Sequence, residues 1–143
     1  MSKIAIVYWS GTGNTEAMAN YIAEGIQAAG GEAARFGPGE FTAAQLDEFG
    51  AVAFGCPAMG SEVLEEMEFE PMFAGLEGSL SGRKVALFGS YGWGDGQWMR
   101  DWCDRCAAAG ASLLEAEGLI VNETPDADGL ESCKELGRKL AAW

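Results

Sequence analysis

The chain has 143 residues, of which 48% are hydrophobic and 22% charged, and its formal net charge is -13. This length suits one domain over residues 1–143, and the composition is ordinary for a globular protein. The negative charge argues against nucleic acid or an anionic membrane as a partner, and the absence of histidine excludes Ser-His-Asp and Cys-His catalytic arrangements. The sequence shows neither a membrane-spanning apolar run nor a targeting segment, so we expect a cytoplasmic monomer.

Acidic residues are concentrated in the middle of the chain. No lysine or arginine occurs from Phe36 to Gly82, whereas nine acids do: Glu40, Asp47, Glu48, Glu62, Glu65, Glu66, Glu68, Glu70 and Glu77. The run from Glu62 to Glu70 is either a solvated face or a docking surface. A protein with a basic docking face would complement it, and we favour that interpretation.

In chain order, apolar runs alternate with stripes of apolar residues at helical spacing. Buried strands are predicted at residues 4–9, 32–36, 51–55, 85–89 and, in part, 112–121. Helices are predicted from four stripes: Met18, Ile22, Ile26 and Ala29; Phe69, Met72, Phe73 and Leu76; Trp98, Trp102 and Cys106; Leu130, Cys133, Leu136 and Leu140. Thr42 and Gln45 predict a capping box on a short helix, and Pro71 suits the first turn of another.

This alternation predicts an α/β fold, a three-layer sandwich with a five-stranded parallel sheet and helices on both faces. Ligands of such sheets bind beyond the carboxyl ends of the strands, where the strand order reverses. The loops at residues 10–15, 56–62 and 90–96 are therefore the candidates for the chemistry.

The first loop reads SGTGNT and is predicted between a strand and an amphipathic helix, where backbone amides form an anion site. Its glycines allow close approach of the backbone, and its hydroxyl and amide groups donate hydrogen bonds. The lysine of a P-loop and the third glycine of a dinucleotide-binding loop are both missing. A single terminal phosphate fits, and a plain Gly/Thr turn that caps a helix is the alternative. The candidate residues are Ser10, Gly11, Thr12, Gly13, Asn14 and Thr15.

The second loop lies within GCPAMGSE at residues 55–62. Pro57 stiffens it, and Gly60 lets the peptide between Gly60 and Ser61 adopt either of two turn conformations. Met59 is predicted to point outward from this loop, although it could instead fold back onto the sheet.

The third loop reads SYGWGDG at residues 90–96. Trp93 stands between Gly92 and Gly94, which offer no side chains for it to pack against, so it suggests a planar partner on which to stack. The alternative is a tryptophan that covers a neighbouring loop. Asp95 is predicted to cap the following helix.

Together the loops describe a phosphate site beside two loops that present Met59 and Trp93 at the same edge of the sheet. A flat aromatic ligand with a phosphate tail fits this arrangement, and flavin mononucleotide (FMN) is such a ligand.

The three motifs, in this order on a chain of five strand–helix units, resemble the short-chain flavodoxins over essentially the whole sequence. The resemblance implies the strand order 2-1-3-4-5, for which flavodoxin is itself the standard example. It implies non-covalent FMN with its phosphate in residues 10–15 and its ring between Met59 and Trp93. It also implies that Glu62 bonds nitrogen 3 of the ring and that the Gly60 carbonyl turns toward nitrogen 5. The second and third loops then contribute Pro57, Ala58, Met59, Gly60, Ser61, Glu62, Ser90, Tyr91, Gly92, Trp93 and Gly94. Long-chain members carry an extra loop in the last strand, for which residues 111–121 leave no room.

By this resemblance the chain is a low-potential one-electron carrier, not an enzyme, and it shuttles between the semiquinone and hydroquinone forms for ferredoxin-type partner enzymes. The acidity agrees, because a carboxylate about 10 Å from the flavin opposes added negative charge by roughly 0.4–1.7 kcal/mol. The alternatives are an FMN-dependent reductase of NAD(P)H or a quinone, and a non-redox FMN-binding module. A nicotinamide site usually needs a cation, and no basic residue is expected near the three loops. A phospho-receiver domain would need an acid where Cys56 stands.

The four cysteines are predicted to be packed rather than reactive. Cys103 and Cys106 fall inside a predicted helix, away from the helix N-terminus where thiols are activated, and no histidine or second pair completes a zinc site. Cys133 lies on an apolar helical stripe and Cys56 follows a buried strand, so both are expected in the core.

Overall fold

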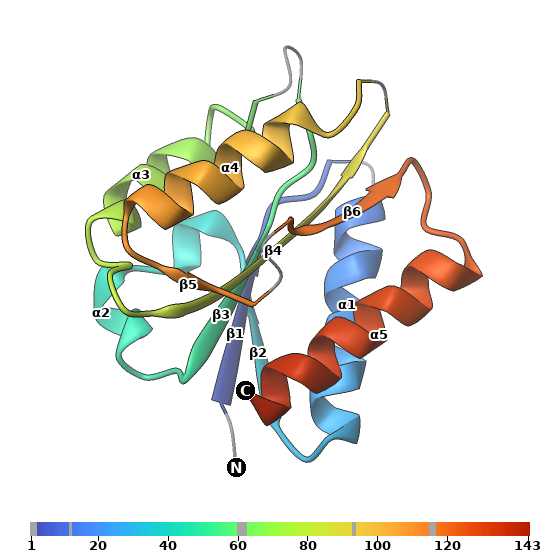
Figure 1. The fold of residues 1–143 in the computed structure, drawn as a ribbon, viewed down its shortest axis with the longest axis horizontal. Coiled ribbons are helices and arrows are strands. Elements are labelled where there is room, and N and C mark those ends of the chain that lie inside the picture. Colours follow the sequence, from blue (N-terminus) through green and yellow to red (C-terminus); the bar gives the residue numbers. More distant parts are fainter. Residues whose placement is uncertain (1–2, 12, 60–62, 93, 115–116) are drawn as a thin grey trace.

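The computed structural model describes residues 3–11, 13–59, 63–92, 94–114 and 117–143 (Figure 1). The strands are β1 (Lys3–Tyr8), β2 (Glu32–Phe36), β3 (Ala51–Gly55), β4 (Lys84–Tyr91), β5 (Ser112–Leu113) and β6 (Leu119–Asn122). The helices are α1 (Asn14–Ala28), α2 (Ala43–Leu46), α3 (Phe69–Glu77), α4 (Gln97–Ala108) and α5 (Ala127–Ala142), with a short 3-10 helix, η1 (Pro38–Glu40), before α2.

All the strands pair in parallel, in the order β2-β1-β3-β4-β5, and β6 also pairs with β4. This confirms the predicted order 2-1-3-4-5. The order reverses between β1 and β3, so a ligand site is expected at the carboxyl ends of these strands.

Helices cover both faces of the sheet (Figure 1). α1 and α5 lie together on one face, and α2, α3 and α4 lie on the other. Every residue of β3 is buried, as a central strand covered on both faces requires. Alternate residues of β1 divide between the two hydrophobic cores, because Ala5 and Val7 face the α3–α4 side whereas Ile4 and Ile6 face α1 and α5.

The strand predicted over part of residues 112–121 is divided into two short strands, β5 and β6. β5 pairs with the start of β4 and β6 with its end, and Leu114 to Gly118 lie between them in sequence. Gly118 has φ +73, and a Cβ there would meet Met99 Sδ at 2.5 Å, so this position favours glycine on both counts.

α1 and α5 approach each other at two glycines. A Cβ on Gly25 would lie 2.0 Å from the carbonyl oxygen of Lys134, and one on Gly137 would lie 2.1 Å from that of Ile22. Helices pack this closely only where a side chain is absent on each, so these glycines set the spacing of this layer.

The helix starts are largely as predicted. The Thr42 amide donates to Gln45 Oε1 at 2.9 Å at the start of α2, and Pro71 lies in the first turn of α3. The buried stripe of α1 ends one turn early, because Ala29 is an exposed C-cap residue rather than a core residue.

All four cysteines are buried free thiols, which confirms that they are packed. Burial raises the pKa of Cys56, Cys106 and Cys133 to about 12 and also raises that of Cys103, so the thiolate needed for reactivity is disfavoured. Within the described ranges no group of acidic or cysteine side chains is placed to hold a metal ion.

In the part of the chain that the structure covers, no helix has both the length and the apolar composition needed to cross a bilayer.

Candidate functional site

A cavity of about 400 Å³ opens at the carboxyl ends of β1, β3 and β4. The predicted site residues that line it are Gly11, Asn14, Pro57, Ala58, Met59, Ser90, Tyr91 and Gly92. Among the described residues, Trp9 and Glu123 line it as well. The structure therefore brings all three predicted loops together. Thr12, Gly60, Ser61, Glu62 and Trp93 lie outside the described residues, so the roles predicted for them stay predictions.

The first loop is shaped by Ser10. Its hydroxyl oxygen accepts hydrogen bonds from the amides of Gly13 (3.1 Å) and Glu16 (3.2 Å), and its own proton remains available to donate. Gly13, the residue that precedes α1, adopts φ +96, a conformation that costs glycine little. The loop thus turns directly into the N-terminus of α1, where amides and the helix dipole favour an anion.

Thr15 makes a contact within the protein that the sequence did not predict, and its role at the phosphate stays a prediction. It is only 1% exposed, and its hydroxyl pairs with that of Ser90 at 3.0 Å. One of the two hydroxyl protons is used in this bond, which leaves the other for a further acceptor. Thr15 therefore ties the start of α1 to the end of β4 and is not simply a free donor in the loop.

The second loop rests on β4 through its backbone. The Cys56 amide donates to Phe88 O at 3.1 Å, and the Ala58 amide donates to Ser90 O at 3.0 Å. A Cβ on Gly89 would lie 2.2 Å from Cys56 O, so the close approach requires glycine there.

Met59 is fixed by its partner across the loop. Its amide donates to Val63 O at 2.9 Å and its carbonyl accepts from the Val63 amide at 3.1 Å, as in an antiparallel pair. Met59 is half-buried and lines the cavity, and its contact with a ligand stays a prediction. The two residues that flank positions 60–62, Met59 and Val63, are therefore hydrogen-bonded to each other.

Trp98 of α4 supports the same loop from beneath, since its indole Nε1 donates to Cys56 O at 3.1 Å. Trp102, one turn later on α4 and equally buried, has an Nε1 with no hydrogen-bond acceptor among the described residues. The two tryptophans are therefore equally buried and differ in whether the indole N–H donates a hydrogen bond, so substitutions of them can be compared directly.

We expect Trp98→Phe to lower the free energy of unfolding by about 1 kcal/mol more than Trp102→Phe, because only the first change removes a hydrogen bond and leaves a buried carbonyl unpaired. Urea unfolding of both variants at the same FMN concentration measures the difference. Equal losses in the two variants would mean that the bond to Cys56 contributes nothing.

The third loop begins later than predicted, because β4 extends to Tyr91. The Tyr91 carbonyl accepts from the Glu123 amide at 2.7 Å and from Asn122 Nδ2 at 3.2 Å, which joins the end of β4 to the chain after β6. Sequence reasoning missed Trp9 and Glu123. Trp9 directly follows β1 and Glu123 directly follows β6, at the edge of the sheet where ligands bind. That position was the signal that could have identified them. Glu123 has φ 55, an uncommon conformation for a residue other than glycine.

Asp95 does not cap α4, which corrects the prediction. Gly96 is the residue before the helix, with φ 91, and Asp95 instead pairs with Arg100 at 3.0 Å. Arg100 also donates to the Asp95 carbonyl. A basic residue therefore does lie beside the third loop, contrary to expectation, but its charge is compensated by Asp95.

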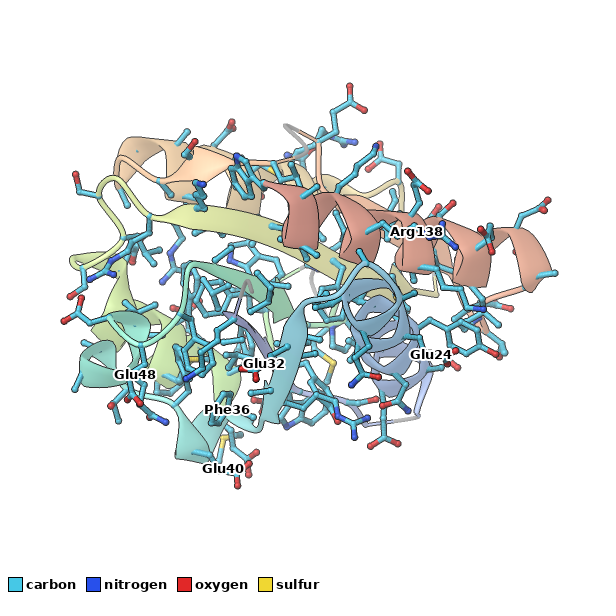
Figure 2. All side chains as sticks on the ribbon, turned by 90° about the horizontal axis from the view of Figure 1, so that it is seen from below. Glu24, Glu32, Phe36, Glu40, Glu48 and Arg138 are labelled. Carbon is cyan, nitrogen blue, oxygen red and sulfur yellow. The ribbon has the colours of Figure 1, made fainter. Side chains whose placement is uncertain are left out.

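The acidic residues between Phe36 and Gly82 are not all unpaired surface charges. Arg105 is held by both carboxylate oxygens of Glu70, at 2.7 and 2.6 Å, and by Glu77 at 2.8 Å, and these bonds raise the pKa of its guanidinium. Asp47 pairs with Arg83. Other acids are exposed on different elements, as Figure 2 shows for Glu24, Glu32, Glu40 and Glu48. The negative charge is therefore spread around the molecule.

Glu65 is a buried cap rather than a surface acid. It is 6% exposed, and its carboxylate accepts from the amides of Met67, Glu68 and Phe69, each at 2.8 Å. Burial acts to raise its pKa, but these three bonds outweigh burial and the pKa is lowered. Glu65 thereby fixes the chain that leads from the second loop into α3.

The residues present fit an FMN-type ligand. A Cβ on Gly11 would lie 2.9 Å from Cη2 of Trp9, so glycine at position 11 leaves room for the Trp9 ring. The aromatic side chains of Trp9 and Tyr91 line the cavity, and Asn14 at the start of α1 also lines it. A larger hollow of about 510 Å³ between β6 and α5 has no aromatic side chain among its described lining residues. The chemistry of the lining, rather than size, identifies the site.

The chain is similar to known proteins over nearly its whole length. The family model described as flavodoxin matches residues 6–137. The chain is 46% identical over 136 residues to a flavodoxin of Clostridium beijerinckii, covering 95% of this chain and 97% of that protein. It is 47% identical over 141 residues to a flavodoxin of Megasphaera elsdenii, covering 96% and 98%.

The fold is similar to the solution structure of two-electron reduced Megasphaera elsdenii flavodoxin, with a TM-score of 0.89 at 46% identity over 98% of this chain and 99% of that one.

Proposed function

The chain belongs to the flavodoxin family of FMN-binding electron carriers, and from that premise we propose that it transfers one electron at a time, at low potential, to ferredoxin-type partner enzymes. Bound FMN supplies the redox chemistry; the polypeptide binds it, sets its electrostatic surroundings and presents it to partners. The proposal takes the carrier to be a cytoplasmic monomer whose partners have basic docking faces.

The observation that supports the proposal best is the cavity at the reversal of strand order, formed by the three loops together. We assign the phosphate to residues 10–15, where hydrogen-bond donors and the α1 N-terminus replace a cation. We assign the two faces of the flavin ring to Met59 and Trp93, and nitrogen 3 to Glu62. The Gly60 carbonyl is proposed as the acceptor for a proton at nitrogen 5.

Low potential follows from charges that are not compensated. Glu123 places an exposed carboxylate on the cavity wall, and Glu16 places another in the first turn of α1. Arg100, beside the third loop, is paired with Asp95. Added negative charge in the cavity is therefore opposed by the protein, which disfavours the last reduction step. A reductase would need a cation to bind the phosphate of a nicotinamide cofactor. Arg100 is poorly suited to that role because it is paired with Asp95.

A visible spectrum recorded during stepwise anaerobic reduction tests the proposal. We expect a flavin spectrum that passes through a stable half-reduced form before it bleaches, and Gly60→Ala should make that form less abundant. Failure of the purified protein to take up added FMN would overturn the cofactor assignment. Direct bleaching without the half-reduced form would instead indicate a two-electron reductase.

A further inference from the structure

Two buried hydroxyl groups join the first loop of the site to the strand that leads into the third loop. Thr15 is 1% exposed and Ser90 is 4% exposed, and their hydroxyl oxygens lie 3.0 Å apart. The bond between them uses one of their two protons. The other proton requires an acceptor, because a buried donor without a partner is costly.

Both hydroxyl groups are carried by backbone that is already fixed. Ser90 is the next-to-last residue of β4, where its carbonyl accepts from the Ala58 amide at 3.0 Å and its backbone pairs in register with Val121 of β6. Thr15 is the second residue of α1, and the turn around it is closed by two hydrogen bonds to the Ser10 hydroxyl. The pair therefore has little freedom left to lose when a ligand binds.

The direction of the bond between the two hydroxyls follows from their surroundings. Thr15 lies in the first turn of α1, where helix amides and the dipole favour an anion. Ser90 alternates with Phe88, which packs in the core beneath α1, so both side chains are on the α1 face of the sheet. A charged acceptor forms a hydrogen bond roughly twice as strong as a neutral one, so an anion at the helix start takes the Thr15 proton. Thr15 then has only lone pairs to offer, and Ser90 has to be the donor.

We propose that Ser90 is a positioning residue for the FMN phosphate: its hydroxyl donates to Thr15 and thereby holds the Thr15 proton toward the phosphate. The inference rests on the proposed function, which assigns the phosphate to residues 10–15. It gives Ser90 a role through Thr15, although Ser90 itself lines the cavity. Because the SGTGNT loop carries no lysine or arginine, neutral donors have to stabilise the phosphate, and two linked hydroxyls strengthen each other's hydrogen bonds.

Riboflavin, which has the ring and the ribityl chain of FMN but no phosphate, separates this role from a contact with the rest of the cofactor. Isothermal titration calorimetry of the full chain freed of flavin gives a dissociation constant for each of the two ligands. We expect Ser90→Ala to raise the FMN constant roughly fivefold, the contribution of one ordinary hydrogen bond, and to leave the riboflavin constant unchanged. Ser112→Ala, the same change at an exposed position of the same sheet, should alter neither constant.

A double-mutant cycle with Thr15→Val shows whether Ser90 acts through Thr15. Valine keeps the shape of threonine without its hydroxyl, and we expect this change alone to raise the FMN constant about thirtyfold, as for a hydrogen bond to a charged group. Adding Ser90→Ala to Thr15→Val should raise it no further, because no hydroxyl is left to position. Thr15→Ser keeps the hydroxyl, and in that background Ser90→Ala should again weaken FMN binding.

Equal losses of FMN and riboflavin affinity in Ser90→Ala would overturn the inference, because Ser90 would then act on the flavin ring or on the fold. An FMN constant that Ser90→Ala leaves unchanged, or a loss that persists in the Thr15→Val background, would overturn it as well. In each of these cases the unsubstituted protein still binds FMN, and the proposed function stands if reduction passes through the half-reduced form. An unsubstituted protein that binds no FMN would refute both.

Discussion

Gly137→Ala is expected to lower the free energy of unfolding by about 3 kcal/mol or more, because overpacking a close helix contact costs that much when neither backbone can yield. The new Cβ would lie 2.1 Å from Ile22 O, 2.8 Å from Ile26 N and 3.0 Å from Gly25 Cα. These are main-chain atoms of α1, so relief requires α1 and α5 to separate. Urea unfolding followed by circular dichroism, at one fixed FMN concentration, measures the loss.

Gly75→Ala provides the control. Gly75 lies in α3, and a Cβ there would meet nothing within 4 Å. Alanine should therefore stabilise the protein by about 0.5–1 kcal/mol through helix propensity alone. If both substitutions stabilised the protein to the same extent, the close contact between α1 and α5 would be wrong.

Glu65→Gln should cost about 2 kcal/mol at neutral pH, the usual contribution of hydrogen bonds to a charged group. The carboxylate that accepts from Met67, Glu68 and Phe69 loses its charge, and the amide nitrogen of glutamine cannot accept. Because the folded-state pKa of Glu65 is lowered, its stabilisation is fully present above the unfolded-state pKa and disappears as the pH falls through the folded-state value.

The difference between the unsubstituted protein and Glu65→Gln should therefore be largest near neutral pH and shrink below about pH 4, where an unfolded-state glutamate begins to protonate. Unfolding curves at several pH values measure it. Glu66→Gln, next in sequence but exposed, should change stability by less than about 0.5 kcal/mol. A pH-independent difference for Glu65→Gln would show that the side chain matters by shape rather than by charge.

The sequence was sufficient for the sheet, because the continuous apolar run of β3 and the alternating strand–helix pattern both depend on local composition. It was sufficient also for the three loops, since parallel strands place their carboxyl ends on one edge. The sequence predicted a strand in only part of residues 112–121 and did not show which parts, because β5 and β6 are selected by pairing with different ends of β4.

What the sequence did not reveal near the site has one cause, which is that a polar side chain can pair with a residue outside its own motif. Thr15 is bonded to Ser90, 75 positions away in sequence, which the loop motif alone did not reveal. Asp95 was expected to cap α4, but the left-handed conformation of Gly96 begins the helix and leaves Asp95 to Arg100. Glu70 and Glu77 were counted as surface charge, although Arg105 of another helix holds both.

The division of the last strand has a consequence for how such a chain can change. β5 and β6 are each secured to β4 by their own pairing, at opposite ends of that strand. An insertion between Leu113 and Leu119 would therefore leave both registers in place and add material beyond the edge of the sheet. Evolution could lengthen the protein at this point, and an engineer could graft a reporter or affinity module there, without rebuilding either the sheet or the cofactor loops.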